Sequence, residues 1–216
     1  MKSLTLIFLC FFNAFALQSY TPNKDFSSYF NSFNCSQVLN KFFYINCYDY
    51  SLKGTKAVAY KVESSNLKMK QIKKRPRFED DTNIPKKYRT TWSDYKHSGY
   101  TRGHTASNAS FRFSKAAQNS VFLMSNMTPQ NEQINAKIWN EIEQRERELA
   151  LKFQSIEVLN LVLYDKNPKR IKNNIAIPSF YVKIIQTPKF KECYQVPNHE
   201  VVDEKINHYK ISCEQF

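Results

Sequence analysis

The chain has 216 residues, of which 42% are hydrophobic and 24% are charged, a composition that suits one folded domain and excludes a disordered tail or a multi-domain array. Its formal net charge is +13, and this excess of Lys and Arg predisposes the protein toward polyanions such as nucleic acid, anionic lipid or acidic polysaccharide. Solubility alone would also explain such a charge, so the function must be argued from the arrangement of residues along the chain.

The first sixteen residues, MKSLTLIFLCFFNAFA, combine an early lysine, an apolar run too short to span a bilayer, and small residues at Ala14 and Ala16. This pattern predicts a signal peptide over residues 1–16, followed by a single domain over residues 17–216 with no stable membrane insertion after cleavage. The protein is therefore expected to be secreted or periplasmic. A retained N-terminal anchor is the alternative.

Outside that segment the chain has four cysteines, Cys35, Cys47, Cys193 and Cys213. An even number of cysteines in an exported chain favours disulfides, and no pair has the CxxC spacing of a structural zinc site. Pairing of Cys35 with Cys47 and of Cys193 with Cys213 is favoured, because each bond closes a local loop. The other two connectivities stay open.

The first half of the chain predicts one strand and one long loop. Residues 17–34 are aromatic and polar and are expected to form a peripheral arm. Alternation of apolar and polar residues predicts a strand over 56–64. The segment 65–98 is polar and contains two prolines, which predicts a long functional loop. Ten Lys or Arg and only four acidic residues lie between its positions 68 and 96, so positive charge is concentrated there.

The second half predicts three strands and one long helix. Residues 119–130 are expected to form a buried strand followed by a proline-containing turn. Residues 133–153 predict an amphipathic helix, because charged residues separate four apolar residues at helical spacing, Ile134, Ile138, Ile142 and Leu149. Two further strands are predicted over 156–165 and 174–186, and a short helix over 201–212. Strands combined with one long helix predict an α+β fold.

The stretch GYTRGHTASNASF, residues 99–111, contains Gly99 and Gly103, two of only three glycines in the chain. Glycine is required where the backbone has φ > 0 or passes close to another group, so both glycines are expected to let the chain turn sharply. Arg102 and His104 lie beside them. An arginine can hold a phosphate through two hydrogen bonds and an imidazole can take a proton from water, which suits phosphodiester hydrolysis. On this hypothesis Gly103→Val would be folded but inactive.

Two residues of the predicted helix suit a metal. Asn135 lies on its first turn and Glu143 follows eight residues later, so on one continuous helix they would lie about 80° apart with Trp139 between them. One amide oxygen is a poor ligand set for zinc or calcium, but magnesium keeps most of its waters and often takes a single protein contact plus substrate phosphate. A nearby carboxylate can hold those waters. A helix N-terminal asparagine with a solvated glutamate is the alternative interpretation.

Three blocks, SGYTRGH, FLMSNMTPQ and INAKIWNEIEQRERELA, resemble in order and spacing the motifs of the DNA/RNA non-specific endonuclease family. The similarity runs from about Cys35 to the C-terminus. It implies an α+β fold in which an antiparallel sheet core carries a ββα-metal finger, with the active site on a long helix. It also implies endonucleolytic hydrolysis of phosphodiester bonds in DNA and RNA to 5′-phosphorylated oligonucleotides, with Mg²⁺ as cofactor and Mn²⁺ as a substitute.

The resemblance also implies roles for individual residues. His104 would be the general base that activates water, Asn135 the direct magnesium ligand, and Glu143 a residue that binds water molecules on the metal. Asn126 would help to orient the site. The metal and arginine side chains would stabilise the negative charge of the transition state.

Arginines are the implied phosphate contacts. Arg102 would contact phosphate, as would an upstream arginine in KRPRF, where Arg75 is preferred to Arg77. The family's aspartate before Arg-Gly-His is Thr101 here, a departure that bears on the local hydrogen bonding. His97 lies close upstream and is interpreted as a surface residue, with a second proton carrier as the alternative.

Two other functions stay open. A secreted nucleic-acid-binding protein would keep the fold and the basic loop while being catalytically weak or inactive, and Thr101 is the only support for it. A basic membrane-damaging factor would need an exposed amphipathic helix, whereas the apolar face of this helix is expected to pack on the sheet. Neither a preference between DNA and RNA nor the oligomeric state follows from the sequence.

Overall fold

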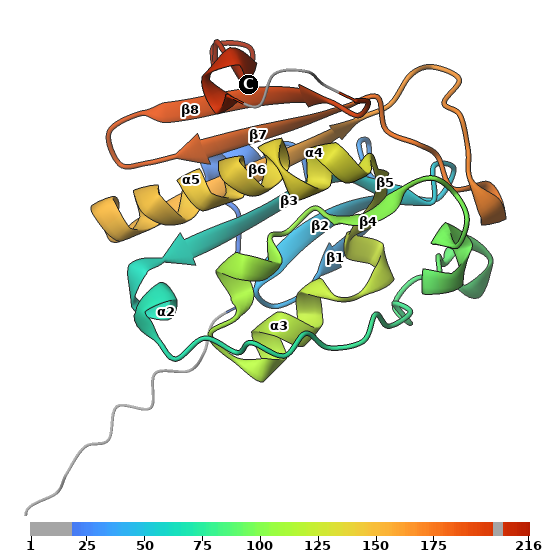
Figure 1. The fold of residues 1–216 in the computed structure, drawn as a ribbon, viewed down its shortest axis with the longest axis horizontal. Helices are drawn as coiled ribbons and strands as arrows, with labels where there is room; N and C mark the ends of the chain where they lie inside the picture. The colour runs from blue at the N-terminus through green and yellow to red at the C-terminus, as the bar shows by residue number, and fades with distance from the viewer. Residues whose placement is uncertain (1–18, 201–204) are drawn as a thin grey trace, which may run out of the picture.

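The computed structural model describes residues 19–200 and 205–216, so the predicted signal peptide lies outside the described residues. Its centre is a seven-stranded antiparallel sheet with the order β1-β2-β3-β6-β7-β8-β9 (Figure 1). The strands are β1 (Gln37–Asn40), β2 (Tyr44–Asp49), β3 (Gly54–Glu63), β6 (Ser155–Leu163), β7 (Phe180–Gln186), β8 (Lys191–Pro197) and β9 (Lys210–Ile211). A separate antiparallel pair consists of β4 (Thr101–His104) and β5 (Met127–Gln130). The predicted antiparallel α+β core is confirmed.

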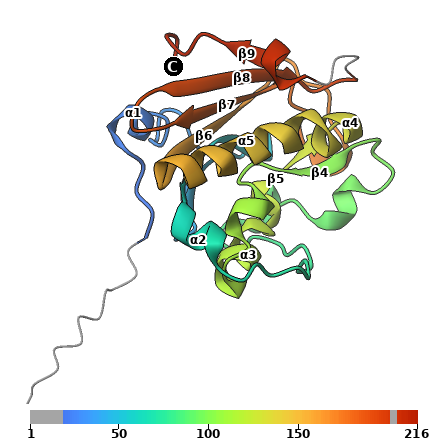
Figure 2. The ribbon, with the colours of Figure 1, turned by 60° about the vertical axis from the view of Figure 1, so that its left-hand side comes forward.

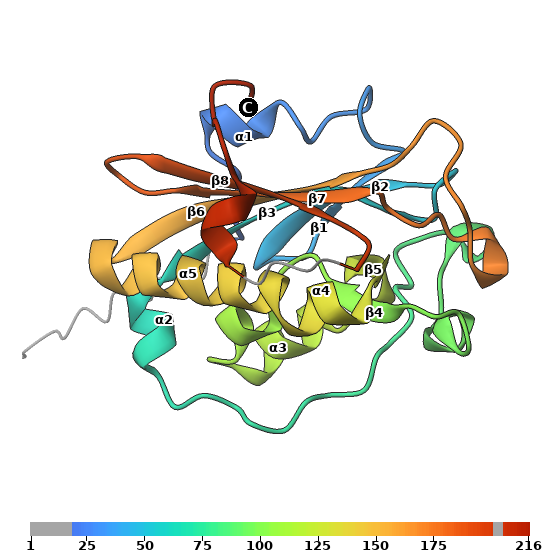
Figure 3. The same cartoon turned by 45° about the horizontal axis from the view of Figure 1, so that its top comes forward.

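Helices cover the two faces of the large sheet unequally (Figure 3). One face carries α1 (Lys24–Ser27), and the other carries α3 (Lys115–Val121), α4 (Glu132–Ala136) and α5 (Ile138–Phe153). The larger hydrophobic core lies on the side of α5 and includes Trp139 and Ile142. The smaller one includes Phe26 of α1, which is only 2% exposed. The arm predicted to be peripheral therefore covers a sheet face, because the apolar side chains on that face also need burial.

The chain between the paired strands β3 and β6 forms the layer that carries the candidate site. It begins with α2 (Ser64–Lys68), and the predicted long loop then passes α3 (Figure 2). A buried ion pair of Lys41 with Asp81, with an N···O distance of 2.6 Å, ties the loop to the sheet. The backbone N–H of Glu79 also donates to the carbonyl of Phe122. These contacts give the loop a fixed course in spite of its polar composition.

The prediction for residues 119–130 is wrong in its order of elements. Helix α3 continues to Val121, and the strand of this segment is β5, which contains Pro129 rather than ending before it. Proline has no N–H to donate, so it is tolerated only where a strand has an unpaired side. β5 offers such a side, because it pairs only with β4 in the described sheets.

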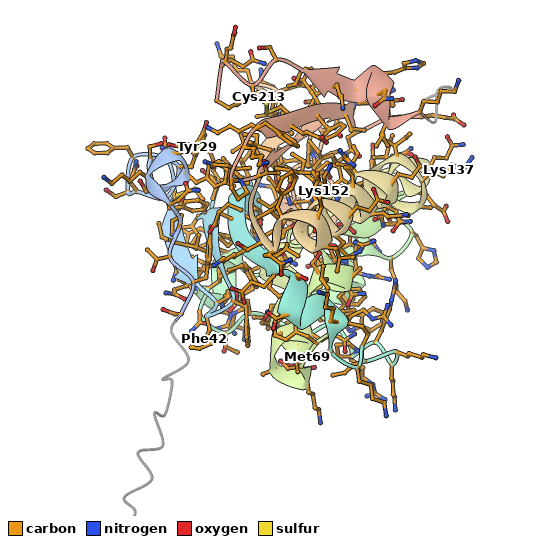
Figure 4. All side chains as sticks on the ribbon, turned by 90° about the vertical axis from the view of Figure 1, so that its left-hand side faces the viewer. Tyr29, Phe42, Met69, Lys137, Lys152 and Cys213 are labelled. Carbon is orange, nitrogen blue, oxygen red and sulfur yellow. A yellow bond between two sulfur atoms is a disulfide. The ribbon has the colours of Figure 1, made fainter. Side chains whose placement is uncertain are left out.

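The predicted long helix is interrupted. Lys137 has φ −113° and ψ −91°, so the chain forms α4 and α5 rather than one helix over 133–153. The side chain of Asn131 caps α4 by accepting hydrogen bonds from two of its N–H groups. Lys137 and Lys152, labelled in Figure 4, mark the two ends of α5. All four predicted apolar positions are buried, as expected for an amphipathic helix on a sheet: Ile134, Ile138, Ile142 and Leu149.

The remaining predictions are partly right. The predicted strands correspond to β3, β6 and β7, but β7 begins only at Phe180. Asn173 and Asn174 have positive φ and form a turn, and residues 175–179 connect this turn to the strand. The described part of the predicted C-terminal helix is a 3-10 turn, Ile206–Tyr209, followed by β9. β1, β2 and β8 were not predicted. No helix in the described ranges is long and apolar enough to cross a membrane.

Two disulfides tie the edges of the sheet. Cys35 is bonded to Cys47 on β2, and Cys193 on β8 is bonded to Cys213, which is the pairing favoured by the sequence. Each bond closes a short loop, so each limits the conformations of the unfolded chain near one end of the sequence.

The two glycines of the 99–111 stretch have different structural roles. Gly99 has φ 79°, in the left-handed region that favours glycine, so it makes the expected turn. Gly103 lies inside β4, and the prediction of a sharp turn there is wrong. A Cβ atom on Gly103 would lie 2.6 Å from Cβ of Gln130 on β5. Glycine is needed at this position because the Gln130 side chain crosses directly over it.

Substitution at Gly103 should therefore affect folding and not only activity, in contrast to the folded but inactive protein expected from the sequence. Gly103→Ala should lower the free energy of unfolding by roughly 1–3 kcal/mol, the typical cost of overpacking. Urea denaturation measures this change. Because Gln130→Gly removes the opposing side chain, Gly103→Ala should cost less in that background, and an equal loss in both backgrounds would contradict the close-packing explanation.

Candidate active site

A cavity of about 530 Å³ opens where β4, α4, α5 and the basic loop meet. β4 and β5 pair with Thr101 opposite Gln130 and His104 opposite Met127, and α4 follows β5 directly, which produces the predicted ββα arrangement (Figure 1). Five of the predicted site residues line this cavity: Arg75, Arg102, His104, Asn135 and Glu143. The fold therefore brings together residues that lie far apart in the sequence.

His104 is held in an aromatic wall of the cavity. Its ring centroid lies 4.9 Å from that of Phe122 and 6.0 Å from that of Phe78. Its Nε2 atom is buried and has no hydrogen-bond partner among the described residues. Burial, followed by the positive charge of Arg75, lowers the pKa of His104 to about 3. The imidazole is therefore neutral near pH 7 and can accept a proton.

Two arginines bring positive charge to the same cavity. The guanidinium carbon of Arg102 lies 4.8 Å from the centroid of the Phe78 ring, and Arg102 Nε is buried without a partner within the described chain. Arg75 is exposed and lines the cavity, whereas Arg77 is exposed and does not line it. Guanidinium groups with free N–H donors suit the planar, bidentate recognition of phosphate. The geometry favours Arg75 over Arg77, as the sequence analysis does.

Asn135 and Glu143 reach the cavity from two helices rather than one. The break at Lys137 removes the basis for the predicted 80° separation, although both side chains still line the cavity. Trp139 does not lie between them at the surface, since it is 2% exposed and packs in the core against Tyr181. Asn135 Nδ2 donates a hydrogen bond of 2.9 Å to Oγ1 of Thr101.

The environment of Glu143 disfavours a free negative charge. Burial is the largest cause and raises the pKa of Glu143 to about 7, against the opposing effect of Lys183. Glu146, one turn along α5, adds to the increase, and Arg147 opposes it. A cation in the cavity would favour the ionised carboxylate and relieve part of this cost.

Asn126 does not line the cavity. It is fully buried, and its Oδ1 accepts hydrogen bonds from the N–H of Ala106 (2.8 Å) and from Thr105 Oγ1 (2.6 Å). Its Nδ2 donates to the carbonyl oxygens of Ala106 and Val121. Asn126 therefore fastens the segment that follows His104 to the end of α3.

The donor set of the cavity fits a hard divalent cation. Within residues 19–200 and 205–216, no group of three or more His, Cys, Asp or Glu side chains is placed to hold a metal ion. Asn135 and Glu143 instead offer one amide oxygen and one carboxylate. Hard divalent cations such as magnesium bind oxygen ligands and keep several water molecules, so these two oxygen donors suit such an ion.

Several cavity residues were missed by the sequence analysis. Asn108, Glu132 and Asn140 add polar groups to the lining, and no spacing rule singled them out. Arg147 does not line the cavity, but it follows Glu143 by four residues, the spacing that places two side chains on one helix face. Its Nη1 atom is buried and unpartnered among the described residues. His97 is exposed and lies outside the cavity, which favours its interpretation as a surface residue.

Comparison with known proteins places this geometry in a family. A family model described as DNA/RNA non-specific endonuclease matches residues 22–216. The chain is 32% identical over 161 residues to "Nuclease EXOG, mitochondrial" of Xenopus laevis, covering 66% of this chain and 45% of that protein. It is 28% identical over 161 residues to "Endonuclease G, mitochondrial" of Homo sapiens, covering 69% and 54%. The chain thus spans about half the length of these relatives.

A solved structure supports the same fold. The crystal structure of the EndoG/EndoGI complex contains a chain that matches with a TM-score of 0.74 at 24% identity, covering 82% of this chain and 81% of that one. At this identity the match shows the fold alone. The predicted ββα-metal architecture is confirmed.

The relatives correct the predicted localisation. The similar proteins of Xenopus laevis, Homo sapiens and Saccharomyces cerevisiae are all named mitochondrial nucleases, which points to a mitochondrial rather than a secreted or periplasmic location. The export prediction relied on the composition of residues 1–16 alone. The family match over residues 22–216, together with the shared fold, shows that the chain belongs to the DNA/RNA non-specific endonuclease family.

Proposed function

We propose that the chain is a magnesium-dependent endonuclease that hydrolyses phosphodiester bonds in DNA and RNA and leaves 5′-phosphorylated oligonucleotides, with Mn²⁺ as a substitute metal. The domain responsible is residues 17–216. The observation that carries the proposal is the position of His104, a neutral imidazole with an unpartnered buried nitrogen, in a cavity that also holds two arginines and a carboxamide–carboxylate pair.

His104 is the general base in this mechanism. Its free Nε2 accepts a proton from the water whose oxygen attacks the phosphorus atom. The bond between phosphorus and the 3′ oxygen then breaks, the phosphate stays on the 5′ oxygen, and the departing 3′ oxygen takes up a proton from solvent. Arg75 contributes to the low pKa of His104 in the free protein, so a phosphate bound to Arg75 would offset that charge and make His104 a stronger base. Substrate binding thereby prepares the base for its reaction.

Arg102 and Arg75 hold the phosphate during this step. Their donors bind oxygens that are common to all nucleotides, and phosphate contacts carry no base information, so little sequence preference is expected. A divalent ion held by Asn135, with Glu143 on its water molecules, would supply further stabilisation of the negative charge of the transition state. The basic loop before Arg75 extends the positive surface along which a polyanion approaches.

A catalytically weak nucleic-acid-binding protein is the competing function, favoured only by Thr101 in place of the family's aspartate. The purified chain, incubated with plasmid DNA and with RNA in Mg²⁺ or chelator, separates the two functions. We expect Mg²⁺-dependent cutting of both substrates. Tight binding without cutting would favour the competing function.

Removal of His104 should abolish the cutting. His104→Ala should reduce the rate by roughly 10²–10⁴-fold, the range for a general base. His97→Asn is the matched control, because His97 is exposed, lies outside the cavity and has φ 58°, a conformation that asparagine tolerates. Gel assays of plasmid relaxation measure both. Unchanged cutting in His104→Ala would remove His104 from the mechanism.

The low pKa of His104 predicts an imidazole that stays neutral as the pH falls. Since protonation requires a pH near 3, its ring ¹⁵N and ¹H shifts should stay constant from pH 8 down to about pH 4 in the free protein. Arg75→Ala removes a charge that opposes protonation, so the pKa should rise. Arg77→Ala should have a smaller effect. Protonation of His104 near pH 6.5 in the unmodified chain would contradict the prediction.

The two upstream arginines should differ in their contribution to binding. Arg75→Ala should weaken binding of a labelled DNA duplex in chelator and reduce the slope of log affinity against log salt by about one, the value for one lost phosphate contact. Arg77→Ala should change the slope less, because Arg77 does not line the cavity. Fluorescence anisotropy over a series of salt concentrations measures both. Equal slopes for the two variants would contradict the assignment of Arg75, rather than Arg77, as the phosphate contact.

A further inference from the structure

The position before Arg102 raises a separate question, because Thr101 stands where the family has an aspartate. We propose that Thr101 is a positioning residue that orients the carboxamide of Asn135 so that its oxygen, and not its nitrogen, faces the metal position. This inference rests on the proposed function, since it concerns the residue assigned there as the metal ligand. It explains how a neutral side chain can serve a metal site.

Two hydrogen bonds carry the inference. Thr101 Oγ1 donates to the backbone carbonyl of Gln130 at 2.9 Å, and Asn135 Nδ2 donates to the same Oγ1 at 2.9 Å. Thr101 and Gln130 are also opposite each other in the β4–β5 register. The Thr101 hydroxyl group on β4 is thus anchored by the hydrogen bond that it donates to β5, the other strand of the ββα unit.

The direction of these bonds follows from the number of protons. A hydroxyl group has one proton, and the carbonyl of Gln130 can only accept. Thr101 Oγ1 therefore has no proton left for Asn135 and can act toward it only as an acceptor. Of the two terminal atoms of Asn135, only the amide nitrogen can donate a hydrogen bond to that acceptor. The amide oxygen is therefore the atom left to face the cavity.

The carboxamide of Asn135 needs a partner that fixes its orientation, because of where Asn135 lies in the chain. It lies in the last turn of the five-residue helix α4, two residues before the break at Lys137. Such a short helix is weakly stabilised by its own backbone. The terminal torsion of an asparagine is also soft and roughly two-fold, so without a partner the carboxamide would present oxygen and nitrogen to the cavity in turn. Thr101 is β-branched and its χ1 torsion is restricted, so its hydroxyl group keeps a constant direction toward Asn135.

Metal affinity in the absence of nucleic acid tests the inference. Mn²⁺ alone is titrated into the purified full chain, and free Mn²⁺ is followed by electron paramagnetic resonance. Thr101→Val keeps the shape and removes the acceptor, so it should weaken Mn²⁺ binding by about fivefold or more, the typical worth of one hydrogen bond. Thr101→Ser keeps the hydroxyl and should stay within about twofold of the unmodified chain.

A second background separates orientation from general structural damage. In Asn135→Asp both terminal side-chain atoms are oxygens, so no flip can present a nitrogen to the metal. Thr101→Val should therefore cost little or no Mn²⁺ affinity in that background. If circular dichroism shows that Thr101→Val does not fold, Thr101→Ala replaces it in the same comparison of Mn²⁺ affinities, because alanine also lacks the acceptor.

The outcomes are distinct. Equal Mn²⁺ affinity of Thr101→Val and the unmodified chain would overturn the inference while leaving the proposed function intact. The same loss in both the Asn135 and Asn135→Asp backgrounds would also overturn it, because the loss would then not arise from carboxamide orientation. Absence of Mn²⁺ binding by the unmodified chain would overturn the metal assignment of the proposed function, and this inference with it.

Discussion

A buried ion pair holds helix α5 on the sheet, and the geometry of the site depends on it. Lys183 on β7 and Glu146 on α5 are both fully buried, with an N···O distance of 2.6 Å. Tyr60 on β3 and Ser110 also donate to the Glu146 carboxylate, so four segments meet at one group. Loss of one partner would leave an uncompensated buried charge, which typically costs about 3–5 kcal/mol. The helix therefore has one well-defined position relative to the sheet.

Because α5 has a fixed position, the cavity can hold ionisable side chains from distant parts of the chain close together. Glu143 lies one turn before Glu146 on α5, so its place relative to β4 is set by the core rather than by a surface loop. His104 is fixed from the other side by two aromatic rings, and Asn126 fastens the chain that follows it. A neutral histidine and a carboxyl group with a raised pKa can share this space because burial disfavours charge on both.

Thr101 holds its place in the site through hydrogen bonding. The hydroxyl lacks the negative charge of the family's aspartate, but its single proton is used by the Gln130 carbonyl, and so it remains an acceptor toward Asn135. Gly103, two residues later, shows the opposite situation. The Gln130 side chain occupies the space that any Cβ would need, so that position depends on shape rather than on hydrogen bonding.

The sequence by itself determined the family and the buried apolar face of residues 133–153, because these depend on local spacing: the three blocks and the four buried apolar positions. It favoured the disulfide pairing that the structure contains, since each bond closes a short loop, but it left two other pairings open. Only the tertiary structure showed that the helix breaks at Lys137 and that Gly103 lies in a strand. It also showed that Arg75 lines the cavity and that Arg77 does not. The pKa of His104 and the buried Lys183–Glu146 pair were also beyond the sequence. Each of these depends on which distant side chains share a volume, and a one-dimensional pattern does not contain that information.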